Sequence, residues 1–318
     1  MSGLPCPSDV LASTGYSDRG PGIYPRRMTR ASFADYLKSW PLLLLPHQLL
    51  SRLVRHATRW QATWWKNFLI RHFIRLFDVD MTEAQLQQPG DFADFNAFFT
   101  RALRDDNRPP PVDPQAIACP VDGRVSACGS IEADRILQAK GHDYSLTTLL
   151  GGDSQLAARF SGGQFATLYL SPRDYHRIHM PCSGRLQETV YVPGRLFSVG
   201  PHTVRAINRL FTRNERLVTC FDTASGPMAV DMVGAIFVSC METVWEGVVN
   251  PHMGMSRQSR QFGENGPELP GGAELGRFNM GSTVILLYAP GQAEWDASLA
   301  AGKAVRMGQQ IGLLHQGN

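Results

Sequence analysis

The sequence predicts an α+β fold in which N-terminal amphipathic helices are followed by a mostly antiparallel β domain. Residues 31–77 carry apolar side chains at helical spacing, whereas short apolar runs alternate with turns rich in glycine and proline from residue 116 onward. The triplet Pro109-Pro110-Pro111 separates the two patterns, so we place the domain boundary there. The predicted regions are a leader (1–30), a helical region (31–108) and a β-rich domain (109–318).

The leader is rich in glycine, proline and serine, and we expect it to be mobile. Residues 1–20 lack the basic start and the apolar run of a secretory signal. The apolar stretch Ser39–Ser51 is too short to cross a bilayer and contains two prolines. We therefore expect neither a secretory signal nor a membrane-spanning helix.

The helical region carries the basic character of the chain. Ten of the 31 Lys and Arg residues lie between Arg26 and Arg75, with Asp35 as the one acid, which leaves 21 basic residues against 27 acids elsewhere. The apolar residues at helical spacing are Leu50, Leu53, Val54, Ala57, Trp60, Trp64 and Phe68. The basic residues Arg52, Arg55, Arg59 and Lys66 fall largely on other faces. Four of the six tryptophans also lie here, at Trp40, Trp60, Trp64 and Trp65.

Tryptophan and basic residues on one amphipathic helix are typical of a bilayer interface, where the indole lies among the headgroups. The alternative is a helical cap that packs on the protein's own core and exposes a solvated basic face. Binding to nucleic acid is less favoured, because the apolar content exceeds that of a simple phosphate-binding surface. We favour the interface, because the charge bias and the tryptophans coincide in the same segment.

The cysteines are scattered along the chain. They are Cys6, Cys119, Cys128, Cys182, Cys220 and Cys240. These spacings match neither a zinc site nor a disulfide framework, which suits a reducing compartment.

The stretch Gly276–Tyr288 combines a glycine-punctuated approach with a continuous apolar run. The pattern predicts a buried strand whose first residue is Ser282. Gly281 lacks a Cβ, so it can adopt a strained backbone and leaves its carbonyl carbon open to attack by the next side chain. On this stretch alone, an ordinary turn into a core strand is the simpler interpretation.

A second polar segment runs from Ser171 to Pro181. Ser171 and Asp174 match the N-cap and the acid of a short helical turn, with His176 in the turn and His179 in the following strand. Two histidines three residues apart could bind a metal, but no third ligand at a suitable spacing is evident, so we predict no metal. Asp122 lies in an Asp-Gly turn before another predicted strand, which by itself indicates only a structural turn.

Taken together, these residues make the chain resemble the phosphatidylserine decarboxylases of the membrane-associated, pyruvoyl-dependent type. The blocks that carry the resemblance are Phe95-Asn96-x-Phe98-Phe99-x-Arg101, Pro120–Gly123, Lys140-Gly141-His142, Tyr169–Pro181, Phe197–Val199, Leu210–Arg216 and Gly276–Pro290. The family usually reads Leu-Gly-Ser-Thr at its processing site, whereas this chain has Met280 before Gly281, a volume-conserving change. The register of His202 also departs from the family pattern, and we assign this residue no role.

The resemblance implies that the chain makes its own cofactor. The Ser282 hydroxyl would attack the Gly281 carbonyl, with His179 as base and Asp122 as its partner in a triad. Cleavage would give a β chain (1–281) and an α chain (282–318) that begins with a pyruvoyl group. That group would form a Schiff base with phosphatidylserine, release carbon dioxide and yield phosphatidylethanolamine. By the same resemblance, His176 transfers the proton and Asp174 orients His176 or shapes processing.

Two other functions remain open from the sequence. The first is a lipid serine hydrolase that uses Ser282 without cleaving itself, although the sequence lacks a G-x-S-x-G elbow. The second is a non-catalytic lipid-binding relative. For the decarboxylase we expect anionic bilayers as partner, a cleaved α/β-chain heterodimer and, by resemblance only, a homodimer. We expect it to be peripheral on the cytoplasmic face of a bacterial inner membrane.

Overall fold

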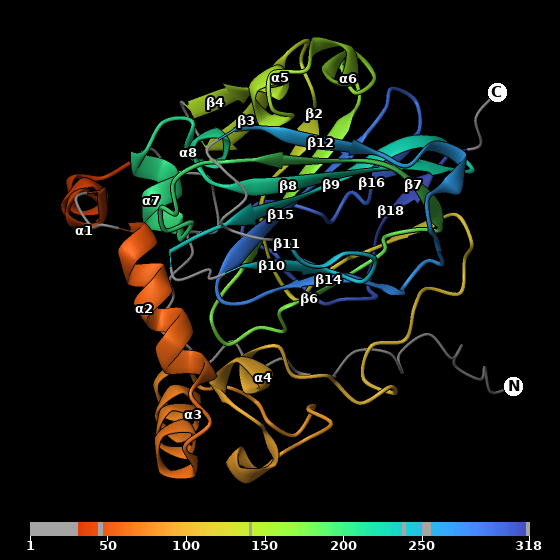
Figure 1. Ribbon diagram of the computed structural model, residues 1–318. Coiled ribbons are helices and arrows are strands. Elements are labelled where there is room, and N and C mark those ends of the chain that lie inside the picture. Colours follow the sequence, from red (N-terminus) through yellow and green to blue (C-terminus); the bar gives the residue numbers. More distant parts are fainter. Residues whose placement is uncertain (1–30, 44–46, 140–141, 237–239, 250–255, 316–318) are drawn as a thin grey trace, which may run out of the picture.

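The computed structural model describes residues 31–43, 47–139, 142–236, 240–249 and 256–315. The predicted leader and the Lys140-Gly141 pair therefore lie outside the described residues. Figure 1 shows helices along one side of a β-rich body, which confirms the predicted α+β class.

The N-terminal helices form a column beside the β domain (Figure 1). They are α1 (Phe33–Leu43), α2 (His47–Arg59), α3 (Thr63–Phe77), the 3₁₀ turn η1 (Pro89–Asp91) and α4 (Phe95–Phe99). The Asp94 carboxylate caps α4 by accepting the Ala97 N–H at 2.7 Å. Aromatic rings hold α3 to α4, because Phe73 meets Phe95 and Phe98 edge-on at centroid distances of 5.2 and 5.9 Å. The helical region thus has a small core of its own.

Part of the predicted basic surface is structural. Lys66 is buried, and its ammonium donates to the carbonyl oxygens of Pro89 and Gly90 at 3.1 and 3.2 Å. Asp35 forms an ion pair with Arg205 at 2.7 Å, which ties α1 to α7 (Pro201–Ala206). The helices therefore also pack on the protein itself, as in the cap alternative.

The β domain is built on a nine-stranded antiparallel sheet. Its strand order is β12-β7-β8-β9-β15-β5-β2-β17, and β13 pairs with β7 beside β12. The strands are β2 (Gly123–Ser130), β5 (Gln164–Leu170), β7 (Gly184–Val192), β8 (Arg216–Thr223), β9 (Gly226–Gly234), β12 (Gln258–Gln261), β13 (Glu268–Leu269), β15 (Ser282–Tyr288) and β17 (Ala304–Val305).

Smaller elements cover both faces of this sheet (Figure 1). On one face lies a four-stranded antiparallel sheet of order β11-β10-β14-β6. Its strands are β6 (Arg177–His179), β10 (Met241–Thr243), β11 (Gly247–Val249) and β14 (Glu274–Phe278). The remaining elements are β1 (Ala116–Ala118), β3 (Arg135–Ala139), β4 (His142–Ser145), β16 (Ala293–Trp295), β18 (Gln310–Leu314), η2 (Gly263–Asn265), α5 (Leu146–Leu149), α6 (Ser154–Ala158), α7 and α8 (Leu210–Arg213).

Strand β15 lies between two hydrophobic clusters. Val284 and Leu286 belong to the cluster beneath the four-stranded sheet, whereas Ile285 and Leu287 belong to the cluster beneath the short helices. Successive side chains of a strand point to opposite faces, so an uninterrupted apolar run is buried on both. The predicted buried strand that begins at Ser282 is therefore confirmed.

A buried carboxyl group lies on the face of the sheet that the short helices cover. Asp231 on β9 is fully buried, and among the described residues neither of its oxygens has a hydrogen-bond partner. Burial raises the pKa of Asp231 to about 7, while the charge of Arg216 opposes the shift. The Arg216 guanidinium itself donates to main-chain carbonyl groups, including Leu149 O at 2.6 Å. Asp231 is therefore neutral below neutral pH.

We predict that Asp231→Asn stabilises the protein more at pH 8 than at pH 5. Because the folded pKa of Asp231 is raised, the wild type loses stability as pH rises from about 4 to about 7, by at most about 1.4 kcal/mol per pH unit. Asparagine has no proton to lose and escapes this loss. Thermal unfolding at the two pH values measures the difference, and an equal effect at both would contradict the prediction.

Candidate active site

The predicted site residues gather at one end of the nine-stranded sheet. Ser282 lies directly opposite Leu170, the last residue of β5. On the other side of β5, Arg124 lies opposite Tyr169, so Gly123 reaches the level of Leu170. Neighbouring strands are about 4.8 Å apart, which places the main chains near Asp122 and Ser282 about 10 Å from one another. The fold thus brings two distant segments to the same edge.

The histidine segment returns over this edge. After β5 the chain turns, and the Asp174 carboxylate closes the turn by accepting the Ser171 N–H at 2.7 Å. Main-chain hydrogen bonds then hold β6 and the residue before it from two sides. The His179 N–H donates to Pro120 O at 2.9 Å, and the Phe278 N–H donates to His176 O at 3.1 Å. Main-chain hydrogen bonds therefore join the Asp122, histidine and Ser282 segments.

Ser282 is fully buried, and its hydroxyl has no hydrogen-bond partner among the described residues. It alternates with Val284 and Leu286, so it faces the cluster beneath the four-stranded sheet. The two preceding residues have left-handed backbones, with φ of +90° at Met280 and +39° at Gly281. Such a conformation costs a non-glycine residue about 1–2 kcal/mol. Strain is therefore stored directly before the unpartnered hydroxyl.

His176 is fully buried against Phe99, with 4.1 Å between the ring centroids. Its Nδ1 lies 2.8 Å from the main-chain oxygen of Asp174, which can only accept, so Nδ1 carries the proton. Nε2 then has a lone pair that no described group engages. Burial, together with the nearby charge of Arg101, lowers the pKa of His176 to about 3, although the hydrogen bond to the Asp174 carbonyl opposes the shift. His176 is thus a neutral imidazole with a free acceptor nitrogen.

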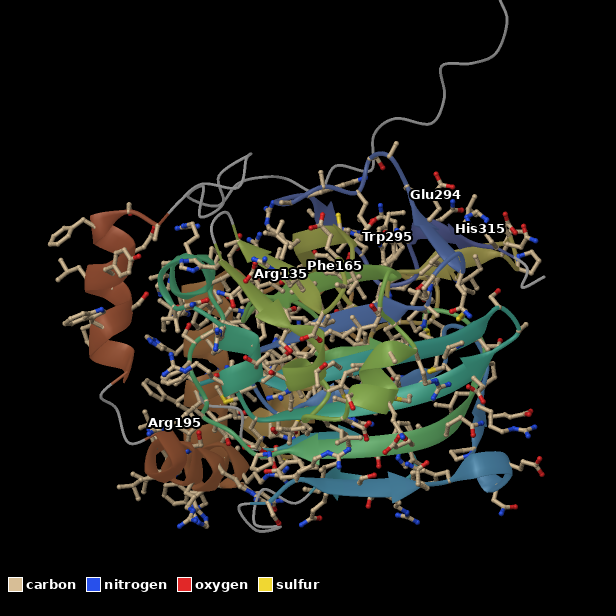
Figure 2. All side chains as sticks on the ribbon, turned by 90° about the horizontal axis from the view of Figure 1, so that it is seen from above. Arg135, Phe165, Arg195, Glu294, Trp295 and His315 are labelled. Carbon is tan, nitrogen blue, oxygen red and sulfur yellow. The ribbon has the colours of Figure 1, made fainter. Side chains whose placement is uncertain are left out.

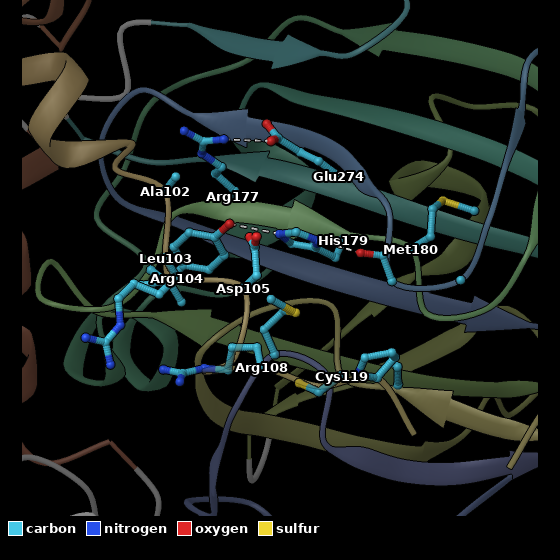
Figure 3. A pocket seen from close by; sticks show the side chains of 17 residues that line it. Ala102, Leu103, Arg104, Asp105, Arg108, Cys119, Arg177, His179, Met180 and Glu274 are labelled. Carbon is cyan, nitrogen blue, oxygen red and sulfur yellow. Dashed lines mark hydrogen bonds and ion pairs between the residues drawn. The ribbon is translucent and has the colours of Figure 1, made fainter. Parts of the chain in front are cut away.

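His179 has both ring nitrogens engaged (Figure 3). Its Nδ1 lies 2.8 Å from Gly272 O and carries the proton by the same argument, while Nε2 accepts from the Tyr175 hydroxyl at 2.9 Å. Burial lowers the pKa of His179, while the hydrogen bond to Gly272 and the negative charges of Glu274 and, more weakly, Asp122 oppose that shift. Nε2 is therefore the basic atom of this ring.

The guanidinium group of Arg108 holds Asp122, a contact that the sequence pattern does not predict. Arg108 donates Nε–H to Oδ1 at 3.0 Å and Nη2–H to Oδ2 at 2.7 Å, and the Met307 N–H also donates to Oδ1. Arg108 further pairs with Glu83 at 2.7 Å. Within the described part of the chain, no hydrogen bond joins the side chains of Asp122, His179 and Ser282.

A cavity of about 360 Å³ borders the site on the His179 side (Figure 3). Tyr175, His179 and Arg108 contribute to its wall. Arg177 and Glu274 also line it and form an ion pair at 2.9 Å. The cavity thus has both apolar and charged walls next to the Tyr175–His179 pair.

The family model described as phosphatidylserine decarboxylase matches residues 95–313. This chain belongs to the phosphatidylserine decarboxylase family. A second model, described as PSD, matches residues 37–78. The two matches together cover most of the helical region and every predicted site residue, so the resemblance inferred from sequence is confirmed.

The relatives match over most of their length. The phosphatidylserine decarboxylase proenzyme of Pseudomonas paraeruginosa is 53% identical over 290 residues, which cover 90% of this chain and 99% of the relative. The proenzyme of Ectopseudomonas mendocina is 54% identical over 271 residues, covering 85% and 95%. That of Nitrosococcus oceani is 51% identical over 281 residues, covering 88% and 92%.

We predict that the His176 ring stays neutral and protonated at Nδ1 down to about pH 4. Burial keeps the ring neutral, and the Asp174 carbonyl holds the proton on Nδ1. Nitrogen NMR of ¹⁵N-histidine-labelled protein follows the ring, with His176→Gln identifying the resonance. A titration midpoint near 6.5, the value of an exposed histidine, would contradict the prediction.

Proposed function

We propose that this protein is a phosphatidylserine decarboxylase that cleaves itself at Gly281–Ser282 to form a pyruvoyl group. The observation that carries the proposal is the buried Ser282 hydroxyl, which has no hydrogen-bond partner among the described residues and follows two left-handed residues, in a chain of this family. The proenzyme names of the relatives fit a protein that is processed.

The residues present fit this chemistry. The Ser282 oxygen bonds to the Gly281 carbonyl carbon, the C–N bond breaks, and the freed nitrogen takes the proton, which leaves an ester. Loss of the Ser282 α-proton then breaks the Cβ–Oγ bond and releases the Gly281 carboxylate. Water replaces the nitrogen of the resulting terminus, and ammonia leaves. The left-handed backbone of Met280 stores strain next to Gly281, whose bond to Ser282 is the one that is lost.

His179 is our candidate for the base of this step, and Nε2 is the atom that takes the proton. Tyr175 occupies Nε2 in the uncleaved chain, so its hydroxyl must turn away first. Asp122 assists through its charge, which favours the protonated ring of His179 without a direct hydrogen bond. Arg108 fixes the position of that charge.

A pyruvoyl group supplies an electrophilic carbonyl that acts as an electron sink for the loss of carbon dioxide. His176 is our candidate for the proton transfer that follows. Its neutral Nε2 can take the proton that the substrate amine releases and return it to the α-carbon. Asp174 holds the ring for this task, because its main-chain oxygen binds Nδ1 and its carboxylate closes the turn.

The sheet retains the α chain (282–318) after cleavage. Strand β15 is paired along its whole length with β5 and β9, and β18 is paired with β1. These ladders bind the two chains without a disulfide. The homodimer expected from the resemblance stays a prediction.

The helical region offers a surface for the lipid substrate. Exposed apolar side chains gather there and project from the N-terminal helices in Figure 2. They are Phe33, Tyr36, Leu37, Trp40, Leu49, Leu53, Trp60, Trp64, Phe68 and Leu76. Among the described residues, no helix is long and apolar enough to span a membrane. We propose a peripheral protein on the cytoplasmic face of a bacterial inner membrane, where exposed Arg52 and Arg71 face anionic lipid.

We predict that Ser282→Ala gives a single full-length chain that releases no carbon dioxide from phosphatidylserine. The hydroxyl makes no hydrogen bond with the described residues, so its removal leaves the fold intact. Denaturing mass spectrometry and a carbon dioxide assay measure the two effects, with Ser259→Ala on the edge strand β12 as control.

Cleavage of the Ser282→Ala chain would contradict the proposal. An intact wild-type chain labelled at Ser282 by a fluorophosphonate would favour the lipid hydrolase. An intact wild-type chain that binds phosphatidylserine vesicles without releasing carbon dioxide would favour the non-catalytic relative.

We predict that Trp64→Ala weakens binding to phosphatidylserine vesicles about tenfold or more, because an exposed indole loses its buried area in the interface. Trp64 is 67% exposed and meets Trp60 and Trp65 at centroid distances of 5.7 Å each. Vesicle sedimentation measures the affinity. The control is Val112→Ala, a fully exposed apolar residue outside the helices. Equal binding of both variants would contradict the interface.

A further inference from the structure

Helix α2 reaches the segment that precedes the scissile bond. Arg59, its last residue, places Nη2 3.5 Å from Oε1 of Glu242 on β10. The same Oε1 accepts the Asn279 side-chain N–H at 2.8 Å. The Asn279 main-chain N–H also donates to Cys240 O at 3.1 Å. One carboxylate thus links α2 to a residue just before the Gly281–Ser282 bond.

The helices contact the next residue as well. Met280 packs against the small core of the helical region, which includes Ile70 and Phe98. This is the residue with φ of +90°. Strained backbone persists only where its surroundings hold it in place. Here β10 holds Asn279 while the helical core holds Met280, on the upstream side of the bond.

A row of ion pairs continues from Glu242 across the four-stranded sheet. Glu242, Arg277 and Arg177 lie side by side on β10, β14 and β6. Arg277 is 3.9 Å from Glu242 and 2.7 Å from Glu274, which pairs with Arg177 at 2.9 Å. The row crosses the strand that leads to Ser282 and the strand that carries His179.

The far end of this row returns to the helices. Arg177 Nε–H donates to the main-chain oxygen of Thr100, at the end of α4, at 2.9 Å. The next residue, Arg101, donates Nη2–H to Arg173 O at 3.1 Å in the histidine turn. The helical region therefore holds both the scissile segment and the histidine segment, through different helices.

We propose that helices α2–α4 act as a clamp that aligns the scissile segment for self-cleavage, with Arg59 as its positioning residue. The proposal rests on the proposed function, namely cleavage at Gly281–Ser282. Attack requires the Ser282 oxygen and the Gly281 carbon to lie about 3–3.5 Å apart, and a shift of about 1 Å can cost about 100-fold in rate. The Arg59–Glu242–Asn279 path opposes such a shift from outside the reacting residues.

The test compares cleavage rates of newly made protein. Arg59→Met, Asn279→Ala and the double variant are synthesised in a membrane-free translation extract, and the loss of full-length chain is followed over time. The control is Arg185→Met, which removes an arginine from an exposed ion pair with Glu268 at a distant edge of the sheet. Unfolding temperature and carbon dioxide release per mature α chain are measured for each variant.

We expect Arg59→Met and Asn279→Ala each to slow cleavage about tenfold. The double variant should be no slower than the slower single variant, because both changes break one path. Mature chains, once formed, should release carbon dioxide at the wild-type rate. The Arg185→Met control should cleave as the wild type does.

If the Arg59→Met variant cleaves at the wild-type rate, the clamp proposal is wrong. Parallel losses of cleavage rate, unfolding temperature and activity per mature chain would also overturn it, because they would indicate a general structural role. If the wild type itself fails to cleave and matches Ser282→Ala, the proposed function fails first, and the clamp with it.

Discussion

The main-chain ladder of β15 is the constraint on which the site depends. It is paired on both sides, so Ser282 is fixed at the end of the sheet opposite Leu170 and Gly234. The buried run behind it cannot slip by one residue without turning its side chains to the wrong faces. The preceding residues must therefore absorb the change of direction, which they do with left-handed backbones.

Desolvation sets the chemistry of the residues around that strand. His176, buried against Phe99, is kept neutral. Because the Asp174 carbonyl binds Nδ1, the lone pair lies on Nε2, which no described residue engages. His179 is placed in the same tautomer by Gly272. Backbone carbonyl groups, rather than carboxylates, thus decide which nitrogen of each ring is basic.

The sequence predicts the elements whose signal is local. Thr283–Tyr288 is a continuous apolar run and forms the buried strand, and Gly281 before it has positive φ. Periodicity locates the helices, although it does not show that Lys66 is buried against Pro89. That contact depends on how α3 packs, which no spacing within α3 encodes.

The site contacts that the sequence does not predict join residues from different segments of the fold or depend on side-chain orientation. Arg108 binds Asp122 from beyond the proline triplet, and Gly272 binds His179 from a distant loop. Tyr175 is near His179 in sequence, yet nothing in the pattern indicates that its hydroxyl occupies Nε2. The proposed triad rests on the family resemblance, whereas these partners follow from tertiary packing.

The helical region connects the lipid surface to this chemistry. Its outward side carries exposed tryptophans, and its inward side contacts Met280 and, through Glu242, Asn279. One region thus serves two tasks in our account, which are to hold the protein at a bilayer and to hold the scissile segment in place.

The measurement that tests the central claim most directly is the intact mass of the purified wild-type protein under denaturing conditions. Our account predicts two species that divide after Gly281. The smaller should lack a sequenceable amino terminus and be lighter than the same peptide beginning with serine. A single full-length species in a preparation that releases carbon dioxide from phosphatidylserine would contradict it.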